Sequence, residues 1–318
     1  MTNNTKVACV FGGTGFVGRQ IVRELAKKDY VIKVATRTAE RAYFLKLDGG
    51  PAQIVPFQCD YSDAESIAAA VSGCDVVINC IGILFEKGKK RRFQNAHVDV
   101  PEMIASACKK SGVKKFVHIS ALGVDKGTSK YAKTKLEGEK AALLNFPQAT
   151  ILRPSVIFGE DDSFFNMFAE MSRYTPVLPL IGGGKTKFQP VYVGDVADAV
   201  MSALENMAAQ GQIYELGGPE TISFKEIYQR LFQYTGRRRC LVSIPFGLAK
   251  VEATFMSLLP HPPLTRDQVE SLKTDNVVSK TAQGLSDLGV TATAMDVILP
   301  TYLESYRCGG RFADVKAG

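Results

Sequence analysis

The feature that most constrains this chain is a glycine-rich turn between a short apolar run and a helical pattern. The turn Gly12–Gly18 follows the run Val7–Phe11 and opens the helical pattern Gly15–Lys28. Glycines at 12, 15 and 18 allow a tight turn and close backbone approach to a pyrophosphate, which the helix N-terminus favours through its amides and dipole. Glycines can also serve close strand–helix packing alone, but the strand before and the helix after them favour a dinucleotide site. Its predicted contacts are Gly12, Thr14, Gly15, Phe16, Val17, Gly18 and Arg19.

Short apolar runs and helical patterns alternate along roughly the first 160 residues. Continuous β-branched runs joined through helices are typical of a parallel sheet buried on both faces. We therefore expect an α/β fold, a Rossmann-type doubly wound sheet of about seven parallel strands with a smaller C-terminal lobe. The predicted strands are Val7–Phe11, Val31–Ala35, Ile54–Gln58, Asp75–Ile81, Lys115–Ile119 and Thr150–Leu152. The predicted helices are Gly15–Lys28, Ser62–Ser72, Val100–Ser111 and Lys130–Leu144.

The regular alternation fades after residue 160. Thr175–Gly184 is rich in Pro and Gly and predicts a loop, Gln189–Val193 predicts a strand, and a helix is expected from Asp195. We expect residues 1–160 to form the NAD(P)-binding domain, completed by about 186–215. Residues 161–185 and 216–318 then form the substrate or cap lobe.

Composition excludes several classes of protein. The 318 residues are 46% hydrophobic and contain no run of about 18 apolar residues, so no transmembrane helix is expected. The net charge of +7 is too modest to indicate nucleic-acid binding, and neither the seven cysteines nor the three histidines have the spacing of a metal site. The N-terminus has no signal peptide or Arg-rich presequence, which predicts a cytoplasmic protein.

The end of the second predicted strand indicates the cofactor. NAD-specific sites commonly place an acid there, but this strand ends at Thr36-Arg37. Guanidinium groups suit a 2′-phosphate, so Arg37 and Arg19 favour NADPH over NADH, while Arg41 is either a third contact or a plain surface charge.

The ends of the third and fourth strands supply further predicted contacts. Asp60 is placed to accept a hydrogen bond from the adenine amine, and Tyr61 follows it. Asn79 and Gly82 are expected to lie under the ribose.

Tyr131 and Lys135 are four residues apart and share one face of a predicted helix. A phenol needs a lowered pKa to exchange a proton near neutral pH, and a nearby ammonium and a positive nicotinamide favour the phenolate. We therefore predict Tyr131 as the acid/base and Lys135 as its partner and a ribose contact.

With these residues the chain resembles the short-chain dehydrogenase/reductase superfamily, of the extended or atypical type, over essentially its whole length. The resemblance includes Arg153–Gly159, which in that family reaches the nicotinamide, and Val191–Ala197. It implies cofactor contacts from Pro154, Ser155, Val156 and Phe158.

A narrower likeness is to the Rossmann-type accessory subunits of respiratory complex I and their bacterial relatives. It rests on the glycine turn, Ile81–Glu86, Leu180–Thr186 and Leu264–Val269. This resemblance implies a tightly bound NADPH and does not imply a catalytic role.

The turn after the fifth strand departs from the pattern of active family members. Those members carry several hydroxyl residues there; this chain has Ser120-Ala121-Leu122-Gly123. Ser120 matches the first hydroxyl, with a catalytic, a cofactor-binding or a structural role, the last through a bond to backbone near Tyr131. Leu122 stands where the substrate-polarising hydroxyl is expected. Either Thr128 or Ser129 replaces that hydroxyl, or the protein holds a cofactor with little turnover.

Two surface features bear on partners. The basic residues at 87–92 and 237–239 are either solvated loops or a docking site for an acidic partner or anionic lipid. The segment Phe246–Leu259 has apolar residues at helical spacing and either packs on the C-terminal lobe or exposes an apolar face. His97 is expected to be an ordinary helix residue.

Two functions remain open. One is an NADPH-binding protein associated with the respiratory NADH–quinone machinery, peripheral to the inner face of the membrane. The other is a free cytosolic NADP-dependent reductase, dehydrogenase or epimerase acting on a sugar nucleotide, a steroid-like or a quinone-like molecule.

Overall fold

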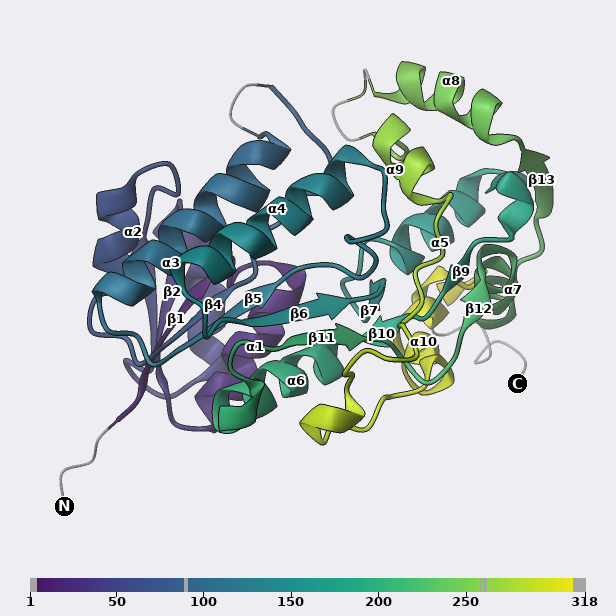
Figure 1. Cartoon of the computed structure of the whole chain (residues 1–318). Helices are drawn as coiled ribbons and strands as arrows, with labels where there is room; N and C mark the ends of the chain where they lie inside the picture. The colour runs from purple at the N-terminus through teal and green to yellow at the C-terminus, as the bar shows by residue number, and fades with distance from the viewer. Residues whose placement is uncertain (1–4, 89–90, 258, 260–261, 311–318) are drawn as a thin grey trace, which may run out of the picture.

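The computed structural model describes residues 5–88, 91–257, 259 and 262–310. Its centre is a seven-stranded sheet in the order β11-β6-β5-β4-β1-β2-β3, in which every neighbouring pair is parallel. The predicted doubly wound fold is thus confirmed (Figure 1). The strands are β1 (Val7–Phe11), β2 (Val31–Thr36), β3 (Ile54–Gln58), β4 (Val76–Asn79), β5 (Lys115–Ile119), β6 (Thr150–Pro154) and β11 (Ile213–Leu216).

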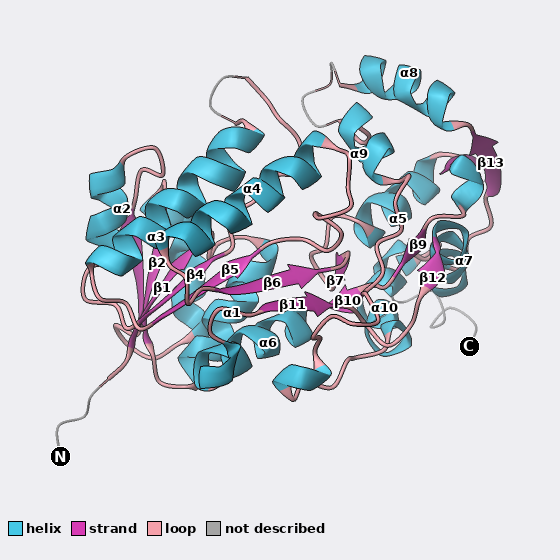
Figure 2. Cartoon of the chain, viewed as in Figure 1, coloured by secondary structure: helices cyan, strands magenta, loops and turns pink. Residues whose placement is uncertain are grey.

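Helices cover both faces of this sheet (Figures 1 and 2). One layer holds α2 (Ala64–Val71), α3 (Val100–Lys110) and α4 (Lys130–Asn145), and the other holds α1 (Phe16–Lys27) and α6 (Val193–Glu205). Side chains alternate across β1, so that Ala8 and Val10 pack toward α1 and α6 whereas Cys9 and Phe11 pack toward α2 and α3. Burial on both faces explains the continuous apolar runs of the sequence.

The C-terminal lobe is built around an aromatic core that includes Phe165, Phe168, Phe224 and Tyr228. Its helices are α5 (Phe165–Tyr174), α7 (Phe224–Thr235), α8 (Phe246–Met256), α9 (Arg266–Ser271) and α10 (Met295–Leu303). Its strand pairs are β7 (Ile157–Phe158) with β10 (Val191–Tyr192), β9 (Lys187–Phe188) with β12 (Ile222–Ser223), and β8 (Val177–Ile181) with β13 (Cys240–Ile244). Shorter helical turns span Ala39–Asp48, Asn95–Asp99, Gly182–Gly184, Met207–Ala209, Ser286–Leu288 and Glu304–Tyr306.

The predicted loop at Thr175–Gly184 is wrong for most of its length. Val177–Ile181 forms β8 and pairs in parallel with β13, more than fifty residues further along the chain. The prolines and glycines favoured a loop, although the apolar run Val177–Ile181 forms a strand when it pairs with the distant β13. Pro179 is tolerated because this sheet has only two strands, so a proline lacking an N–H interrupts no central ladder.

Smaller differences concern element ends and one strand. Strand β11 was not assigned from the sequence. Helix α6 begins at Val193, where the sequence predicted the end of a strand. Strand β4 ends at Asn79, two residues before the predicted end, because the Asn79 Oδ1 atom accepts a hydrogen bond from the Ile81 amide at 3.0 Å.

Candidate functional site

The glycine turn leaves the first turn of α1 open. Gly12 has φ +75°, and a Cβ at Gly18 would overlap the Gly12 carbonyl oxygen and lie 2.7 Å from the Gly13 Cα. Gly15 is the N-cap residue and offers no side chain, and the first turn of α1 has no acid. By contrast, the Asp63 carboxylate accepts hydrogen bonds from two amides at the start of α2. The amides of α1 are therefore available for a phosphate.

Arg37 lies exposed directly after β2, beside the predicted adenosine position. Its guanidinium sits 5.9 Å from the centre of the Tyr61 ring, and the Tyr61 hydroxyl donates to the Ala35 carbonyl at 2.7 Å. Burial raises the pKa of Tyr61, so the phenol stays neutral. Arg37 therefore lies beside the Tyr61 ring at the end of the second strand, a contact that the sequence did not predict.

Arg19 and Asp60 have polar partners within the chain. The Arg19 Nη1 lies 2.6 Å from Asp161 Oδ2, and Asp60 Oδ1 accepts hydrogen bonds from the Ser62 amide and hydroxyl. Arg19 lies in the first turn of α1, after the glycine turn, and Asp60 directly follows β3, which is two strands from β1 in the sheet. Arg19 reaches a nucleotide only in competition with Asp161.

The end of β4 is fixed by buried side chains. Asn79 is fully buried; besides holding the Ile81 amide, it donates through Nδ2 to His118 Nδ1 at 3.0 Å. Gly82 is exposed, and a Cβ there would meet nothing within 4 Å. The buried Asn79 side chain therefore fixes the start of the loop after β4, while Gly82 in that loop has open space beside it.

Tyr131 and Lys135 both lie on α4, as predicted; Lys135 is buried and Tyr131 is partly buried. The Lys135 Nζ donates to the Ile119 carbonyl at 2.8 Å, and burial lowers its pKa to about 8. Burial and the nearby Asp267 charge raise the pKa of Tyr131 to about 12. In the protein chain alone, the tyrosine shift therefore runs opposite to the expected lowering, and the neutral phenol is in the form that donates a proton.

The turn after β5 leaves a buried hydroxyl unused. Ser120 Oγ is buried and has no hydrogen-bond partner among the described residues, so the expected bond to backbone near Tyr131 is not present. The Nε2 atom of His118 on β5 also lacks a partner among those residues. An unsatisfied buried hydroxyl costs about 1–3 kcal/mol, which a bound ligand could recover.

Within the described part of the chain, both hydroxyls proposed to replace the one missing at Leu122 already have partners. Leu122 is buried, and its amide donates to the Pro154 carbonyl. The Thr128 hydroxyl donates to Glu270 Oε1 at 3.1 Å. Ser129 Oγ caps α4 by accepting from the Ala132 amide, and it also accepts from Ser271 Oγ. Both hydroxyls proposed to replace that of an active enzyme thus have structural partners.

Asn276, which sequence reasoning missed, ties the turn after β5 to the segment after β6. Its Nδ2 donates to the Leu122 carbonyl at 3.0 Å, and its Oδ1 accepts from Ser155 Oγ at 2.6 Å and from the Val156 amide at 3.2 Å. No local motif marks Asn276. Pro154 and Phe158 are buried, Phe158 fully and within the aromatic core of the C-terminal lobe.

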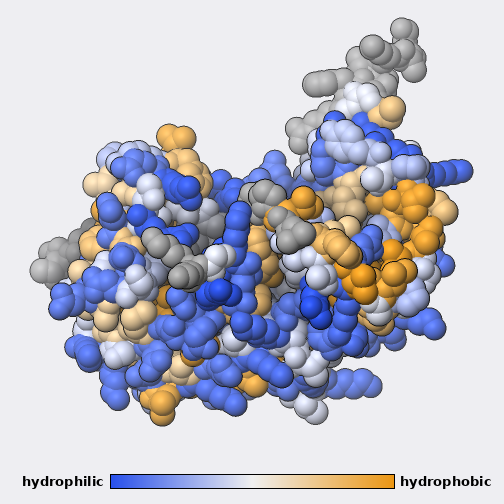
Figure 3. All heavy atoms as spheres, turned by 90° about the horizontal axis from the view of Figure 1, so that it is seen from above, coloured by the Kyte–Doolittle hydropathy of each residue, from blue (hydrophilic) through white to orange (hydrophobic). Residues whose placement is uncertain are grey.

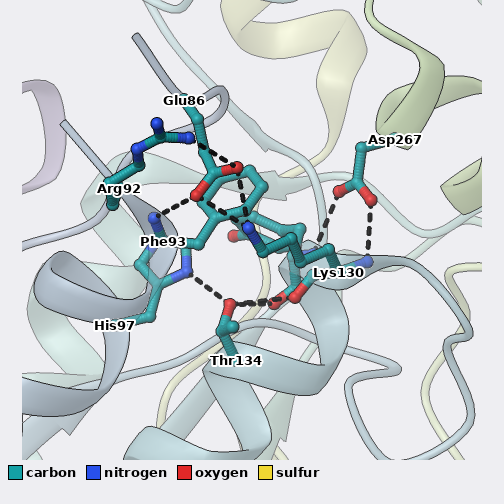
Figure 4. A network of polar contacts seen from close by, with 8 residues as sticks. Glu86, Arg92, Phe93, His97, Lys130, Thr134 and Asp267 are labelled. Carbon is teal, nitrogen blue, oxygen red and sulfur yellow. Dashed lines mark hydrogen bonds and ion pairs between the residues drawn. The ribbon is translucent and has the colours of Figure 1, made fainter. Parts of the chain in front are cut away.

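Asp267 on α9 is a second missed residue. Its two carboxylate oxygens accept hydrogen bonds from the backbone amides of Lys130 and Tyr131, at 2.7 and 3.0 Å (Figure 4). The local signal was a capping box, since Thr265 and Gln268 cap α9 reciprocally. That signal locates the helix but not its contact with α4.

Two surface cavities lie away from these residues. One, of about 520 Å³, lies between α1, α6 and the segment Leu288–Thr291, and the other, of about 550 Å³, lies beside β3 and Ala39–Ala52. Neither is lined by a predicted site residue. In the described part of the chain, no group of three or more His, Cys, Asp or Glu is placed to hold a metal ion.

The sheet, the open glycine turn after β1 and the Tyr131–Lys135 pair on α4 define a nucleotide-binding protein of the short-chain dehydrogenase/reductase type. The chain belongs to the NAD dependent epimerase/dehydratase family, whose model matches residues 8–217.

Two relatives of this chain are subunits of mitochondrial NADH dehydrogenase. The chain is 36% identical over 317 residues to NADH dehydrogenase (ubiquinone) 1 alpha subcomplex subunit 9, mitochondrial, of Arabidopsis thaliana, covering 96% of this chain and 79% of the relative. The mouse subunit of the same name is 35% identical over 295 residues, covering 92% and 78%. The fold also matches the Citrobacter sp. triphenylmethane reductase complexed with NADP(H), with a TM-score of 0.73, 20% identity and coverage of 93% and 98%.

Proposed function

We propose that this protein holds NADPH and associates with the respiratory NADH:ubiquinone oxidoreductase, with little or no turnover of its own. The observation that carries the proposal is the combination of an open glycine turn with a turn after β5 that has lost its hydroxyl at Leu122. The first favours tight nucleotide binding, and the second removes an interaction typically worth about 3–4 kcal/mol in the transition state. The similarity to the mitochondrial subunits supports the association.

NADPH rather than NADH is the proposed cofactor because of the charges at the end of β2. Arg37 is exposed there, and Thr36 stands in place of an acid. A guanidinium stacked near Tyr61 offers paired N–H groups to a 2′-phosphate, which NADH lacks.

We assign the nucleotide to residues 1–160, completed by about 186–215, and the cap to residues 161–185 and 216–318. The pyrophosphate then meets the open amides of α1, and the nicotinamide lies near Ser120, Tyr131 and Ser155. The unpartnered Ser120 hydroxyl is a polar group that such a ligand would satisfy.

The second candidate is a free NADP-dependent reductase, dehydrogenase or epimerase, and the Tyr131–Lys135 pair favours it. The pKa of Tyr131, raised to about 12, keeps the phenol able to donate a proton. A sugar nucleotide, a steroid-like or a quinone-like molecule remains the proposed substrate class in that case.

One experiment separates the two candidates. Purified protein is denatured, and the released nucleotide is identified by chromatography; fresh protein is then titrated with NADPH and NADH by calorimetry. Bound NADPH that is not consumed on adding quinone or sugar-nucleotide acceptors supports the proposal. Rapid NADPH oxidation would favour the free enzyme, and absence of nucleotide binding would reject both.

The C-terminal lobe carries the surface proposed for docking. Helix α8 buries Ala249 and Ala253 but leaves Leu248 60%, Val251 55% and Phe255 70% exposed, so the exposed-face alternative describes these three residues. Apolar side chains gather over this lobe in Figure 3. Among the described residues, no helix is long and apolar enough to cross a membrane. We propose peripheral attachment at the inner face of the membrane, to complex I or to lipid.

The two basic runs offer fewer free cations for docking to an acidic partner or lipid than their sequence predicts. Arg91 stacks on Phe85 at 4.2 Å and Arg92 lies 3.9 Å from Glu86, while Lys89 and Lys90 fall outside the described residues. In the second run, Arg237 and Arg239 donate to the carbonyls of Tyr306 and Ser172. The solvated-loop alternative therefore describes the second run poorly, because two of its three side chains bind backbone.

Flotation tests the docking surface. The protein is mixed with anionic liposomes, and separately with a complex I preparation, at low and high salt. Phe255→Asp should reduce binding, whereas Thr254→Asp, at an exposed neighbour on the same helix, should reduce it much less. Wild-type protein in neither bound fraction at low salt would reject peripheral attachment.

A further inference from the structure

His97 is a fully buried residue between the loop after β4 and helix α4. It belongs to a π-helical turn, Asn95–Asp99, that runs directly into α3. Such turns are rare and frequently occur at functional sites. A Cβ at Gly138 of α4 would overlap the His97 carbonyl oxygen, so a glycine is needed for α4 to pack this closely against the turn. The π-helical turn and the glycine at position 138 together allow His97 to lie against α4.

The His97 imidazole connects the β4 loop to α4 through hydrogen bonds. The Ile83 amide donates to Nε2 at 3.1 Å, so Nε2 accepts and the proton of the neutral ring lies on Nδ1. Nδ1 then donates to Thr134 Oγ1 at 3.1 Å (Figure 4). The Thr134 hydroxyl in turn donates to the Lys130 carbonyl at 2.9 Å. Every member of this chain of hydrogen bonds has a partner.

The same imidazole also holds the Tyr131 ring. The two rings meet edge to face, with centroids 5.2 Å apart and an interplanar angle of 89°. Phe93 stacks on His97 at 5.1 Å and meets Tyr131 edge-on at 5.9 Å. Rings in these arrangements attract one another beyond their area of contact. Tyr131 is thus fixed on two sides by Phe93 and His97.

We infer that His97 is a positioning residue for the nicotinamide half of the nucleotide. One side chain contacts both the loop after β4, through the Ile83 amide, and the ring of Tyr131. Gly82 of this loop is expected under the ribose, and the proposed function places the nicotinamide near Tyr131. The inference rests on that proposed function. Burial and the nearby Lys135 lower the pKa of His97 to about 3, so Nε2 remains an acceptor at physiological pH.

The test compares a whole nucleotide with a fragment that lacks the nicotinamide half. NADPH and adenosine 2′,5′-bisphosphate are titrated by calorimetry into wild-type protein and into His97→Phe, His97→Gln and Asn95→Ala. His97→Phe keeps an aromatic ring against Tyr131 but leaves the Ile83 amide without an acceptor. His97→Gln offers Oε1 to that amide, and Asn95→Ala changes an exposed residue of the same π-helical turn.

The inference predicts a selective loss. His97→Phe should bind NADPH about tenfold more weakly while its affinity for the bisphosphate stays within about twofold, because a partly buried amide without an acceptor disturbs only the β4 loop. His97→Gln should recover most of the NADPH affinity, and Asn95→Ala should match wild type. The fluorescence anisotropy of bound NADPH, which reports on the nicotinamide, should fall in His97→Phe alone.

Three results would overturn the inference. Equal losses for both ligands would make His97 a merely structural residue, and unchanged NADPH affinity in His97→Phe would remove its role. A His97→Gln variant no better than His97→Phe would show that the Ile83 contact is irrelevant. Wild-type protein that binds neither ligand is a separate outcome, since it rejects the proposed function and the inference with it.

Discussion

The two ends of the candidate nucleotide site are built in different ways. The phosphate end comes from one continuous stretch, with the glycine turn, α1 and Arg37 all within residues 12–37. The nicotinamide end joins the β4 loop, the start of α4, α9 and Asn276, which are separated by up to about two hundred residues. The first can form from local sequence, whereas the second exists only when the C-terminal lobe is folded onto the sheet.

Charge is handled differently at the two ends as well. The start of α1 has neither a side-chain cap nor an acid, so its amides remain open to an anion. The start of α4 is already capped by Ser129 and Asp267 from within the chain. We propose that the open end binds phosphate and that the closed end orients an uncharged group. The predictions below test this contrast.

The largest expected effect is on chemistry at the closed end. If the protein turns over, Tyr131→Phe should lower kcat by about 10²–10⁴, the usual contribution of a positioned acid/base. NADPH affinity should stay nearly intact because the phenyl ring keeps its contacts with Phe93 and His97. Steady-state kinetics and calorimetry measure the two quantities, and an unchanged kcat would show that Tyr131 is not the proton donor.

The next effect concerns the open end. Arg37→Ala should weaken NADPH binding by about 10- to 100-fold, the range for loss of a charged hydrogen bond, and NADH binding much less. Arg41→Ala removes another exposed arginine and separates its two alternatives, since a plain surface charge leaves both affinities unchanged whereas a third contact lowers the NADPH affinity. Calorimetric titration of both nucleotides decides. Equal losses in Arg37→Ala would mean that the guanidinium does not contact the 2′-phosphate.

The same contrast explains what the sequence could predict. Glycines, strand ends and the i,i+4 pair are local signals, so the fold class, the open turn and the positions of Tyr131 and Lys135 followed from them. Asp267 and Asn276 act through contacts across more than a hundred residues, and their local sequence shows only a short helix and a loop. The predicted lowering of the Tyr131 pKa was wrong for a related reason. Burial and the Asp267 charge raise this pKa, and both depend on the assembled C-terminal lobe. Strand β8 likewise needed β13.

A pH effect is expected at the closed end. His97 has a pKa of about 3 in the folded protein and an ordinary value of 6.5. As the pH falls below about 6.5, the unfolded chain binds a proton that the folded protein does not, so stability falls by at most about 1.4 kcal/mol per pH unit from this group. Denaturant unfolding between about pH 7 and 5 should therefore show a shallower loss in His97→Gln than in wild type. Parallel curves would contradict the assignment of a buried, neutral imidazole.

The smallest effect compares two helix caps. Asp267→Asn and Asp63→Asn each keep one acceptor oxygen but lose the charge and one of the two amide hydrogen bonds at a helix start. Each variant should lower the free energy of unfolding by about 1 kcal/mol. Only Asp267 lies against Tyr131, where its charge helps to raise the phenol pKa. Asp267→Asn should therefore lower the Tyr131 pKa, whereas Asp63→Asn should leave it unchanged. Ultraviolet titration of tyrosine, with Tyr131→Phe to identify the signal, measures this shift. If Tyr131 titrates alike in the two variants, then α9 stabilises the closed end without setting the pKa of Tyr131. The two ends would then differ only in whether their residues come from one continuous stretch or from distant parts of the chain.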